Sequence, residues 1–371
     1  MKDAKIFLNR AGCLVVKASA LRLPLKDESV HAIVTSPPYW GIREYAGDQV
    51  MTWESGFQSP FGVEPHPDCA AWPASGCGRC YVCHSVEVLR EMHRVLRPDG
   101  IVFWNLGDCY WRSDLLGKEK ASQGAKLKYK DLVLSPYRVA LAAQADGWWV
   151  RSIVIWEKSN PVPRAVQGRP KEVHDHIIIL SKSARPYWDE EAFSQPGPGF
   201  DPLRPKTITT VWRFPTQRYA GSHFATFPEE LPTRCILAAT SEHGCCPACG
   251  APWQRIVDVQ YEVMSSQSQS SKRPLAKQQA QVFAGHEVRK RRIATTSGWR
   301  PGCECNAGVP IPATVLDPFG GSGTTAVAAI GLRRRFVLAD VAYQDLQLER
   351  IGPRLEEWER LVAPKLGDIE K

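Results

Sequence analysis

Val315-Leu-Asp-Pro-Phe-Gly-Gly-Ser-Gly-Thr-Thr-Ala326 is the stretch that decides the fold. The apolar run Ala313–Leu316 predicts a buried strand ending at Asp317, and the alanine-rich run Thr325–Ile330 predicts a helix. The glycines between them let the backbone approach a ligand closely, while the helix N-terminus directs N–H groups toward it. Strand, glycine turn and helix in this order predict a loop that holds a nucleotide-type cofactor.

A second acidic residue supports this interpretation. The apolar run Arg335–Ala339 predicts a strand, and it ends in Asp340, about twenty residues beyond Asp317. Ligands of open α/β sheets bind at the carboxyl ends of the strands, where a carboxylate can accept hydrogen bonds from ribose hydroxyls. The sequence contains no G-x-x-x-x-G-K-[ST], so we do not expect a phosphate-binding P-loop.

Composition narrows the class of protein. The chain has 371 residues, 43% of them hydrophobic and 23% charged, which is typical of a soluble globular protein with one large or two smaller domains. The net charge of +8 fits a polyanionic partner or an ordinary basic surface. No signal peptide and no membrane-spanning run is evident, so we expect a cytoplasmic protein without a membrane partner.

A proline-rich loop follows another predicted strand. Val30–Val34 reads as a buried strand and leads directly into Thr35-Ser36-Pro37-Pro38-Tyr39-Trp40. Two prolines after a strand fix an extended, rigid loop. On its own, such a loop is either a stiff strand-end turn or part of a catalytic site.

The remaining periodicity predicts an alternation of strands and helices. The predicted strands cover one short strand within residues 5–16, Ile101–Asp108, Trp149–Trp156 and His174–Leu180, and the predicted helices cover Val86–Leu96 and Tyr137–Gly147. Such alternation favours a parallel sheet with helices on both faces.

The proline and glycine loops together resemble the S-adenosylmethionine-dependent amino-methyltransferases of DNA. The matching motifs are Ser36-Pro37-Pro38-Tyr39 and Asp317-Pro318-Phe319-Gly320-Gly321-Ser322-Gly323. Their order, with the catalytic loop first, resembles the circularly permuted β subclass. Similarity to the family extends to Lys158–Pro163, His174–Ile177 and His223–Leu231. In one departure, Ser19 stands where the family often has Asp, which puts the usual adenine contact in doubt.

The resemblance implies a class I, Rossmann-like methyltransferase fold and a set of site residues. The implied catalytic residues are Ser36, Pro37, Pro38 and Tyr39. The implied cofactor-binding residues are Asp317, Pro318, Phe319, Gly321, Ser322, Gly323, Thr324, Asp340, Phe227 and Thr35. Within this set the resemblance assigns the methionine amine to Asp317 and the ribose hydroxyls to Asp340.

The resemblance also implies a substrate. Ser36 at the first loop position favours N4 of a cytosine flipped out of double-stranded DNA, with N6 of adenine as the alternative. An RNA or protein methyltransferase is disfavoured by the motif order. A further alternative is an inactive scaffold that binds DNA with the help of zinc. The expected setting is a bacterial cytoplasm, with the chain encoded by a bacterium or a phage and a cognate restriction endonuclease as a possible partner.

The twelve cysteines are mostly clustered, which favours zinc over disulfides in a reducing compartment. The pairs Cys246/Cys249 and Cys303/Cys305 predict one closed, structural zinc site, with Cys245 as a spare thiol. The first cluster in the chain, Cys69, Cys77, Cys80 and Cys83, contains two overlapping C-x-x-C pairs and is flanked by His66 and His84, so its ligand set stays open. Cys13, Cys109 and Cys235 read as ordinary buried thiols.

These features predict the domain organisation. Residues 1–245 and 306–371 form the methyltransferase domain, with a Cys-rich insert at 41–85 and a candidate target-recognition region at 184–222. Residues 246–305 form a zinc-ribbon-like insert. Within it, 260–300 is rich in Ser and Gln and then basic, which predicts a flexible arm that either contacts DNA or is merely solvated.

Overall fold

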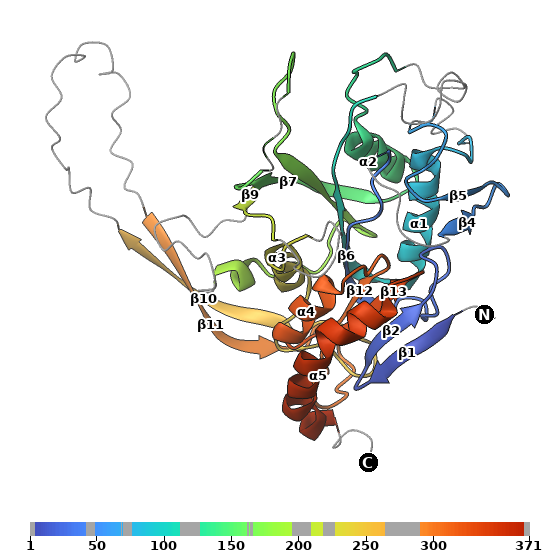
Figure 1. The fold of residues 1–371 in the computed structure, drawn as a ribbon. Helices are drawn as coiled ribbons and strands as arrows, with labels where there is room; N and C mark the ends of the chain where they lie inside the picture. The colour runs from blue at the N-terminus through green and yellow to red at the C-terminus, as the bar shows by residue number, and fades with distance from the viewer. Residues whose placement is uncertain are drawn as a thin grey trace, which may run out of the picture.

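A nine-stranded sheet forms the centre of the computed structural model, with strand order β1-β2-β13-β12-β3-β6-β8-β7-β9 (Figure 1). The structure describes residues 4–41, 49–67, 69, 76–111, 127–161, 163, 166–194, 209–217, 227–263 and 290–366. The sheet strands are β1 (Lys5–Arg10), β2 (Cys13–Lys17), β3 (Val30–Thr35), β6 (Leu96–Leu106), β7 (Trp149–Lys158), β8 (His174–Ser181), β9 (Val211–Phe214), β12 (Thr314–Asp317) and β13 (Arg335–Asp340).

The sheet is mostly parallel. The five adjacent strands β2, β13, β12, β3 and β6 all run in the same direction, and β8 is antiparallel to both of its neighbours. Because β12 pairs directly with β3, the carboxyl ends of these two strands meet at one edge of the sheet. The strand that carries the glycine loop is late in the chain but central in the sheet, as the permuted motif order predicts.

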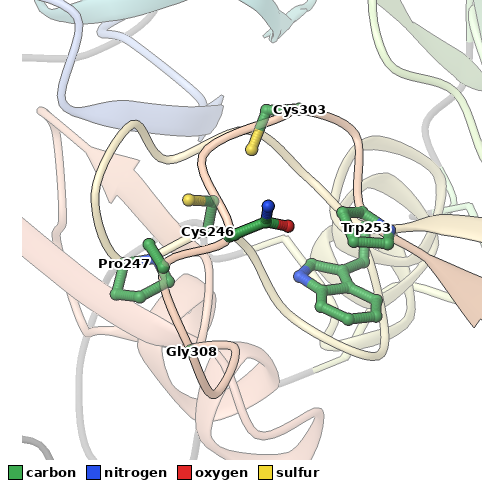
Figure 2. Close-up of a pocket in the computed structure, with 8 residues that line it drawn as sticks. Cys246, Pro247, Trp253, Cys303 and Gly308 are labelled. Carbon is green, nitrogen blue, oxygen red and sulfur yellow. The ribbon is translucent and has the colours of Figure 1, made fainter.

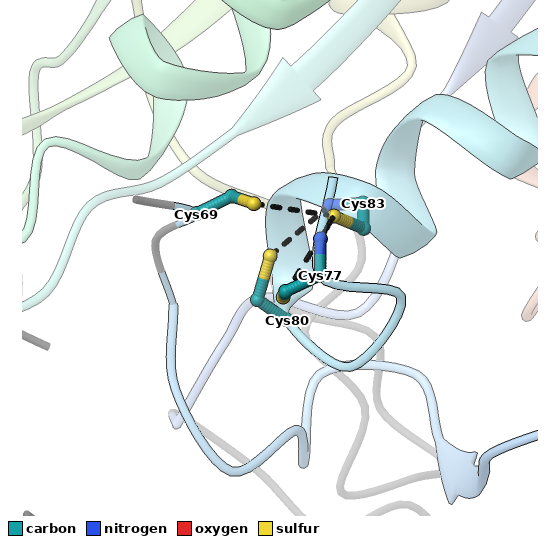
Figure 3. Close-up of side chains that lie close together, drawn as sticks. All are labelled: Cys69, Cys77, Cys80 and Cys83. Atoms are coloured by element: carbon teal, nitrogen blue, oxygen red, sulfur yellow. Dashed lines mark hydrogen bonds between the residues drawn. The ribbon is translucent and has the colours of Figure 1, made fainter. Parts of the chain in front are cut away.

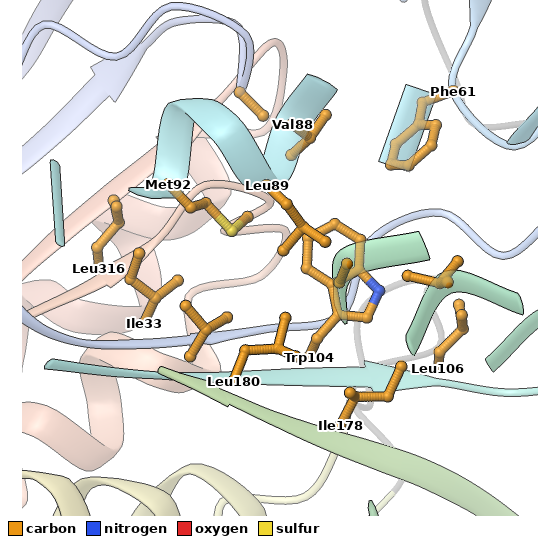
Figure 4. Packing of buried hydrophobic residues seen from close by; sticks show 14 of the residues in the cluster. Ile33, Phe61, Val88, Leu89, Met92, Trp104, Leu106, Ile178, Leu180 and Leu316 are labelled. Atoms are coloured by element: carbon orange, nitrogen blue, oxygen red, sulfur yellow. The ribbon is translucent and has the colours of Figure 1, made fainter. Parts of the chain in front are cut away.

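Helices cover both faces. The helices are α1 (Tyr81–Val95), α2 (Ser135–Ala145), α3 (Glu230–Ala239), α4 (Thr324–Gly331) and α5 (Gln344–Leu366), with a short 3-10 helix at Glu190–Ser194. In β3, Ile33 packs in the hydrophobic cluster under α1 and α2, whereas Ala32 and Val34 pack in the cluster under α3, α4 and α5. Figure 4 shows the first cluster, with Leu89 and Met92 of α1 against Trp104. The predicted Rossmann-like α/β fold is confirmed.

Three elements differ from the predictions. The single strand expected within residues 5–16 is a hairpin of β1 and β2, because Ala11 and Gly12 both adopt positive φ in the turn. Gln254–Val263 (β10) and Lys290–Arg300 (β11) form a two-stranded antiparallel ribbon, so the ends of the supposedly flexible segment are ordered strands. Residues 264–289 lie outside the described part of the chain.

The third difference is in the candidate target-recognition region. Its residues 211–214 form β9, which pairs in parallel with β7 and extends the catalytic sheet. Residues 195–208 and 218–226 lie outside the described part.

In the Cys-rich insert, Val50–Thr52 (β4) and Gln58–Pro60 (β5) form a small hairpin. None of the described helices combines the length and apolar character needed to cross a membrane.

Candidate active site

A hydrogen bond joins the proline loop to the glycine loop. The Thr35 hydroxyl donates to Asp317 Oδ1 at 2.6 Å, and Thr35 is followed directly by Ser36. Asp317 also accepts from the Thr325 hydroxyl at 2.7 Å and from the Phe319 N–H at 3.1 Å. Ser36 and Asp317 therefore lie at the same edge of the sheet. The Asp317 carboxylate, 1% exposed, ties the two loops together, a role that the sequence did not indicate.

Asp340 shapes the glycine loop from the neighbouring strand. Its Oδ2 accepts from the Gly321 N–H at 2.8 Å and its Oδ1 from the Ala342 N–H at 3.1 Å. Gly321 and Gly323 have φ values of +46° and +82°, which other residues rarely adopt. Burial raises the pKa of Asp340 to about 7 against these two hydrogen bonds. Because a carboxylate has about four acceptor positions, Asp340 retains acceptor capacity for a ligand.

The hydroxyls of Ser322 and Thr324 are held by a residue that the sequence analysis did not single out. Arg350 of α5 donates to Ser322 Oγ at 2.6 Å and to Thr324 Oγ1 at 2.9 Å. These two side chains are buried and bonded to Arg350, so only main-chain N–H groups at the start of α4 are left here for a ligand. Phe319 lies 5.7 Å from Phe61, ring centroid to ring centroid. Phe227 packs against the cluster under α3.

Ser36 belongs to a small polar network. Its hydroxyl donates to the Tyr39 hydroxyl oxygen at 3.1 Å. The Asn105 side-chain amide, at the end of β6, donates to Tyr39 at 2.8 Å and to Ser36 at 3.3 Å. Asn105 is 1% exposed, and its Oδ1 has no hydrogen-bond partner among the described residues. Asn105 was not predicted as a site residue; it lies within Ile101–Asp108, which was predicted only as a strand and its loop.

Two residues of the Cys-rich insert contact Pro38. Pro38 O accepts from the Tyr81 hydroxyl at 2.9 Å. Gly62 lies directly behind Pro38, since a Cβ at Gly62 would come within 3.1 Å of the Pro38 Cβ. The rigid loop is thus held from behind by the Cys-rich insert.

An ion pair lies beside the aromatic residue of the loop. Lys158 donates to Asp175 Oδ1 at 2.7 Å. A Cβ at Gly107 would come within 2.7 Å of the Tyr39 ring and 3.0 Å of Asp175 Oδ1, so the Tyr39 ring and Asp175 border the same glycine. The segments that resemble the family around residues 158 and 174–177 therefore flank the proline loop.

The second cysteine cluster consists of the four residues predicted as zinc ligands. The sulfurs of Cys246, Cys249, Cys303 and Cys305 lie within 4.8 Å of one another. Figure 2 shows Cys246 and Cys303 on two facing loops of the pocket that also contains Trp253. Four thiolates at this spacing can hold one metal ion in a closed site.

This cluster lies at the amino edge of the sheet. His31, near the start of β3, pairs with Gly250 O at 2.9 Å, and Arg97 donates to Cys249 O. Cys245 is outside the cluster and donates to Ile311 O at 3.2 Å. Cys13 and Cys235 are buried as predicted, whereas Cys109 is only partly buried.

The first cysteine cluster brings four thiols together. Cys69, Cys77, Cys80 and Cys83 bring their sulfurs within 4.8 Å of one another at the start of α1 (Figure 3). His84 is excluded as a ligand because its ring is paired with Glu64 Oε1 at 3.0 Å and with Gly78 O at 3.3 Å. His66 Nε2 lies 3.9 Å from the Cys77 sulfur. The group whose ligand atoms all lie within 4.8 Å of one another consists of the four cysteines and does not include His66.

Comparison with known proteins identifies related sequences. A model of the N6/N4 methyltransferase family, described as DNA methylase, matches residues 30–246. The type II methyltransferase M.SmaI of Serratia marcescens is 34% identical over 238 residues, which cover 59% of this chain and 72% of that protein. M.Cfr9I of Citrobacter freundii is 34% identical over 249 residues, covering 63% and 74%. Among solved structures, the PvuII DNA methyltransferase, named as cytosine-N4-specific, is 15% identical with a TM-score of 0.49, covering 93% of this chain and 92% of that one.

Proposed function

The chain belongs to the N6/N4 DNA methylase family, and from this premise we propose that it transfers a methyl group from S-adenosylmethionine to N4 of cytosine in double-stranded DNA. The observation that carries the proposal is the 2.6 Å hydrogen bond from Thr35 to Asp317, because it holds the loop for the target base beside the loop for the methyl donor. Ser36 at the first position of the proline loop favours cytosine over adenine by resemblance.

The residues fit the methyl donor. Asp340 has acceptor capacity for two ribose hydroxyls, and Asp317 has one acceptor position beyond its three protein donors for the methionine amine. Main-chain N–H groups at the start of α4 are placed to meet the ligand. The N–H groups of Gly320, Gly321 and Gly323 are instead bonded within the protein, where they fix the shape of the glycine loop. When bound, S-adenosylmethionine supplies an electrophilic methyl group.

The proline loop activates the target amine. An exocyclic amine is a poor nucleophile because its lone pair is delocalised into the ring. We propose that Ser36 Oγ and Pro37 O accept its two hydrogens and return the lone pair to nitrogen. The Ser36 proton is directed toward Tyr39, so a lone pair on Oγ is left for the amine. Pro38 O already accepts from Tyr81, so we assign this role to Pro37 O, as the resemblance implies.

Asn105 is expected to act by orienting Ser36. We expect Asn105→Ala to lower kcat about tenfold, because the amide that fixes both the Ser36 and Tyr39 hydroxyls is lost. Affinity for S-adenosylmethionine, measured by calorimetry, should not change. Since Asn105 acts through Ser36, the double variant with Ser36→Ala should be no slower than Ser36→Ala alone. Independent, multiplying losses would contradict this role.

Binding of the methyl donor should depend on pH. Burial raises the pKa of Asp340 to about 7, so this carboxyl is largely protonated below that pH. Ribose hydroxyls that donate to it favour the ionised carboxylate, and binding then releases a proton. Affinity should therefore rise with pH up to about 7, by as much as tenfold per unit, and level off above it. Calorimetry from pH 5.5 to 8.5 checks this. Asp340→Asn should bind more weakly and with a flatter pH profile.

Charge supports DNA as the substrate. Residues 254–300 contain nine Lys or Arg and three Asp or Glu, a net charge of +6 compared with +8 for the whole chain. Phosphates attract such a segment irrespective of base sequence. Because related chains are named type II methyltransferases, we also propose a cognate restriction endonuclease as the biological partner.

Nucleoside mass spectrometry tests the proposed reaction. DNA incubated with the protein and S-adenosylmethionine is digested to nucleosides, with the Ser36→Ala protein as a control. We expect N4-methylcytosine from the wild-type protein and little or none from the control. N6-methyladenine would keep the reaction class and overturn the assignment of the base. DNA without methylated nucleosides, from a protein that binds the methyl donor, would overturn DNA as the substrate.

A further inference from the structure

The first cysteine cluster has the dimensions of a metal site. The Cys83 sulfur lies 3.6 Å from that of Cys69 and 3.9 Å from that of Cys77. Zinc–sulfur bonds of about 2.3 Å in a tetrahedron place neighbouring sulfurs about 3.8 Å apart. All four cysteines are free thiols. Backbone N–H groups already point at two of the sulfurs: Cys77 N–H donates to Cys83 Sγ at 3.3 Å, and Cys83 N–H to Cys80 Sγ at 3.4 Å.

We propose that Cys69, Cys77, Cys80 and Cys83 bind one zinc ion, and that this ion holds the catalytic loop in place. The functional half of this inference rests on the proposed methyl transfer. The zinc ion is structural, because four thiolates leave no position for substrate. Its effect on catalysis is indirect and passes through α1 and the Cys-rich insert.

The first connection is through Tyr81. Cys80 is the N-cap of α1 and Tyr81 is its first residue, so the position of the ion fixes the position of Tyr81. The Tyr81 side chain is fully buried, and its hydroxyl donates to Pro38 O at 2.9 Å. The metal ligand Cys80 is therefore the direct sequence neighbour of Tyr81, which holds the proline loop.

The second connection is through His84, which follows Cys83. The His84 ring is stacked on Trp53 at 3.6 Å and is paired with Glu64. The Glu64 carboxylate accepts from the Gly62 N–H at 3.2 Å, and Gly62 O in turn accepts from the Gly41 N–H at 2.9 Å. Gly62 is also the residue that lies directly behind Pro38. Both connections end on the loop Ser36–Gly41.

The other cluster provides a matched control. Cys246, Cys249, Cys303 and Cys305 lie by the start of β3, where His31 contacts Gly250, whereas Ser36 follows the other end of that strand. Cys77 and Cys305 are both exposed, so Cys77→Ser and Cys305→Ser are comparable changes at opposite edges of the sheet. Each should remove one metal ion, but only the first should loosen the catalytic loop.

Metal content is the first measurement. Plasma mass spectrometry of the full chain, purified with zinc in the medium, should find two zinc ions per wild-type protein and one in each variant. Hydrogen exchange is the second measurement. The Gly41 amide should exchange at least tenfold faster in Cys77→Ser and at the wild-type rate in Cys305→Ser. Two zinc ions in Cys77→Ser, or equal Gly41 exchange in both variants, would overturn the inference.

Tyr81→Phe removes the hydrogen bond to Pro38 O without removing a metal ligand. This variant keeps all four thiolates and should retain two zinc ions, so it remains informative if Cys77→Ser does not fold. The lost hydrogen bond should lower kcat about fivefold, with unchanged affinity for S-adenosylmethionine. A wild-type kcat would overturn the Tyr81 connection. If the wild-type protein methylates no DNA, the proposed function fails, whereas metal content and Gly41 exchange still test the zinc site and its effect on the loop.

Discussion

Replacing Ser36 by alanine is expected to lower kcat by about 100-fold or more while leaving affinity for S-adenosylmethionine unchanged. The Ser36 hydroxyl is held by Tyr39 and Asn105 in a fixed orientation, so in the proposed mechanism it accepts a hydrogen of the target amine without reorganisation. Preorganised hydrogen bonds to a reacting group contribute on this scale. The measurement is single-turnover methylation of DNA by the variant, with calorimetry of the methyl donor alongside.

Ser36→Thr is the matched control, because it keeps a hydroxyl at the same position. We expect it to retain more activity than Ser36→Ala. If Ser36→Ala methylated DNA at the wild-type rate, the hydroxyl would not be the acceptor and the carbonyl of Pro37 would have to act alone. If Ser36→Ala also weakened binding of S-adenosylmethionine, Ser36 would belong to the cofactor site instead.

Replacing Asp317 by alanine is expected to weaken binding of S-adenosylmethionine by at least 100-fold and to destabilise the protein. The substitution leaves the hydroxyls of Thr35 and Thr325 and the Phe319 N–H without their acceptor in a buried site. Each unpaired buried group costs about 1–3 kcal/mol. Thermal unfolding and calorimetry measure the two effects separately.

Thr35→Val removes the hydrogen bond between the two loops but keeps the Asp317 carboxylate, so it separates the effects of the two. Valine has the shape of threonine and lacks only the hydroxyl that donates to Asp317. We expect Thr35→Val to lower kcat/KM by about tenfold and to weaken donor binding much less than Asp317→Ala does. Asp317→Ala with wild-type stability and donor affinity would contradict both roles of this carboxylate.

The sequence was sufficient for the central part of the fold. Strong apolar runs around Ile33, Leu316 and Val337 predicted parallel strands, and these strands are adjacent in the sheet. Helix α5 was missed because Gly352 and Pro353 interrupt its apolar pattern. The helix forms nevertheless, because burial of Ile351, Leu355 and Trp358 outweighs the low helix propensity of Gly352 and Pro353. The β10–β11 ribbon was missed because its exposed, polar composition resembles that of a flexible segment.

The proposed site could be predicted from the sequence where a short motif forms it. It could not be predicted where side chains distant in the sequence complete it. Ser36, Asp317 and Asp340 follow from local patterns, and the Thr35–Asp317 hydrogen bond brings the two loops together as expected. Asn105, Tyr81 and Arg350 contribute through contacts with residues at least 26 positions away in the sequence. No local pattern marks such residues, because their partners are set by the packing of β6, α1 and α5 on the sheet.

A crystal structure of the protein with S-adenosylmethionine tests the central claim most directly. That claim is that the loops Thr35–Tyr39 and Asp317–Gly323 form a single methyl-transfer site. The account predicts the ribose hydroxyls of the donor within hydrogen-bond distance of Asp340, and its methyl group directed toward the side of the loop that carries Ser36 and Pro37 O. A donor bound away from Asp340, or with its methyl group turned away from Ser36, would contradict it.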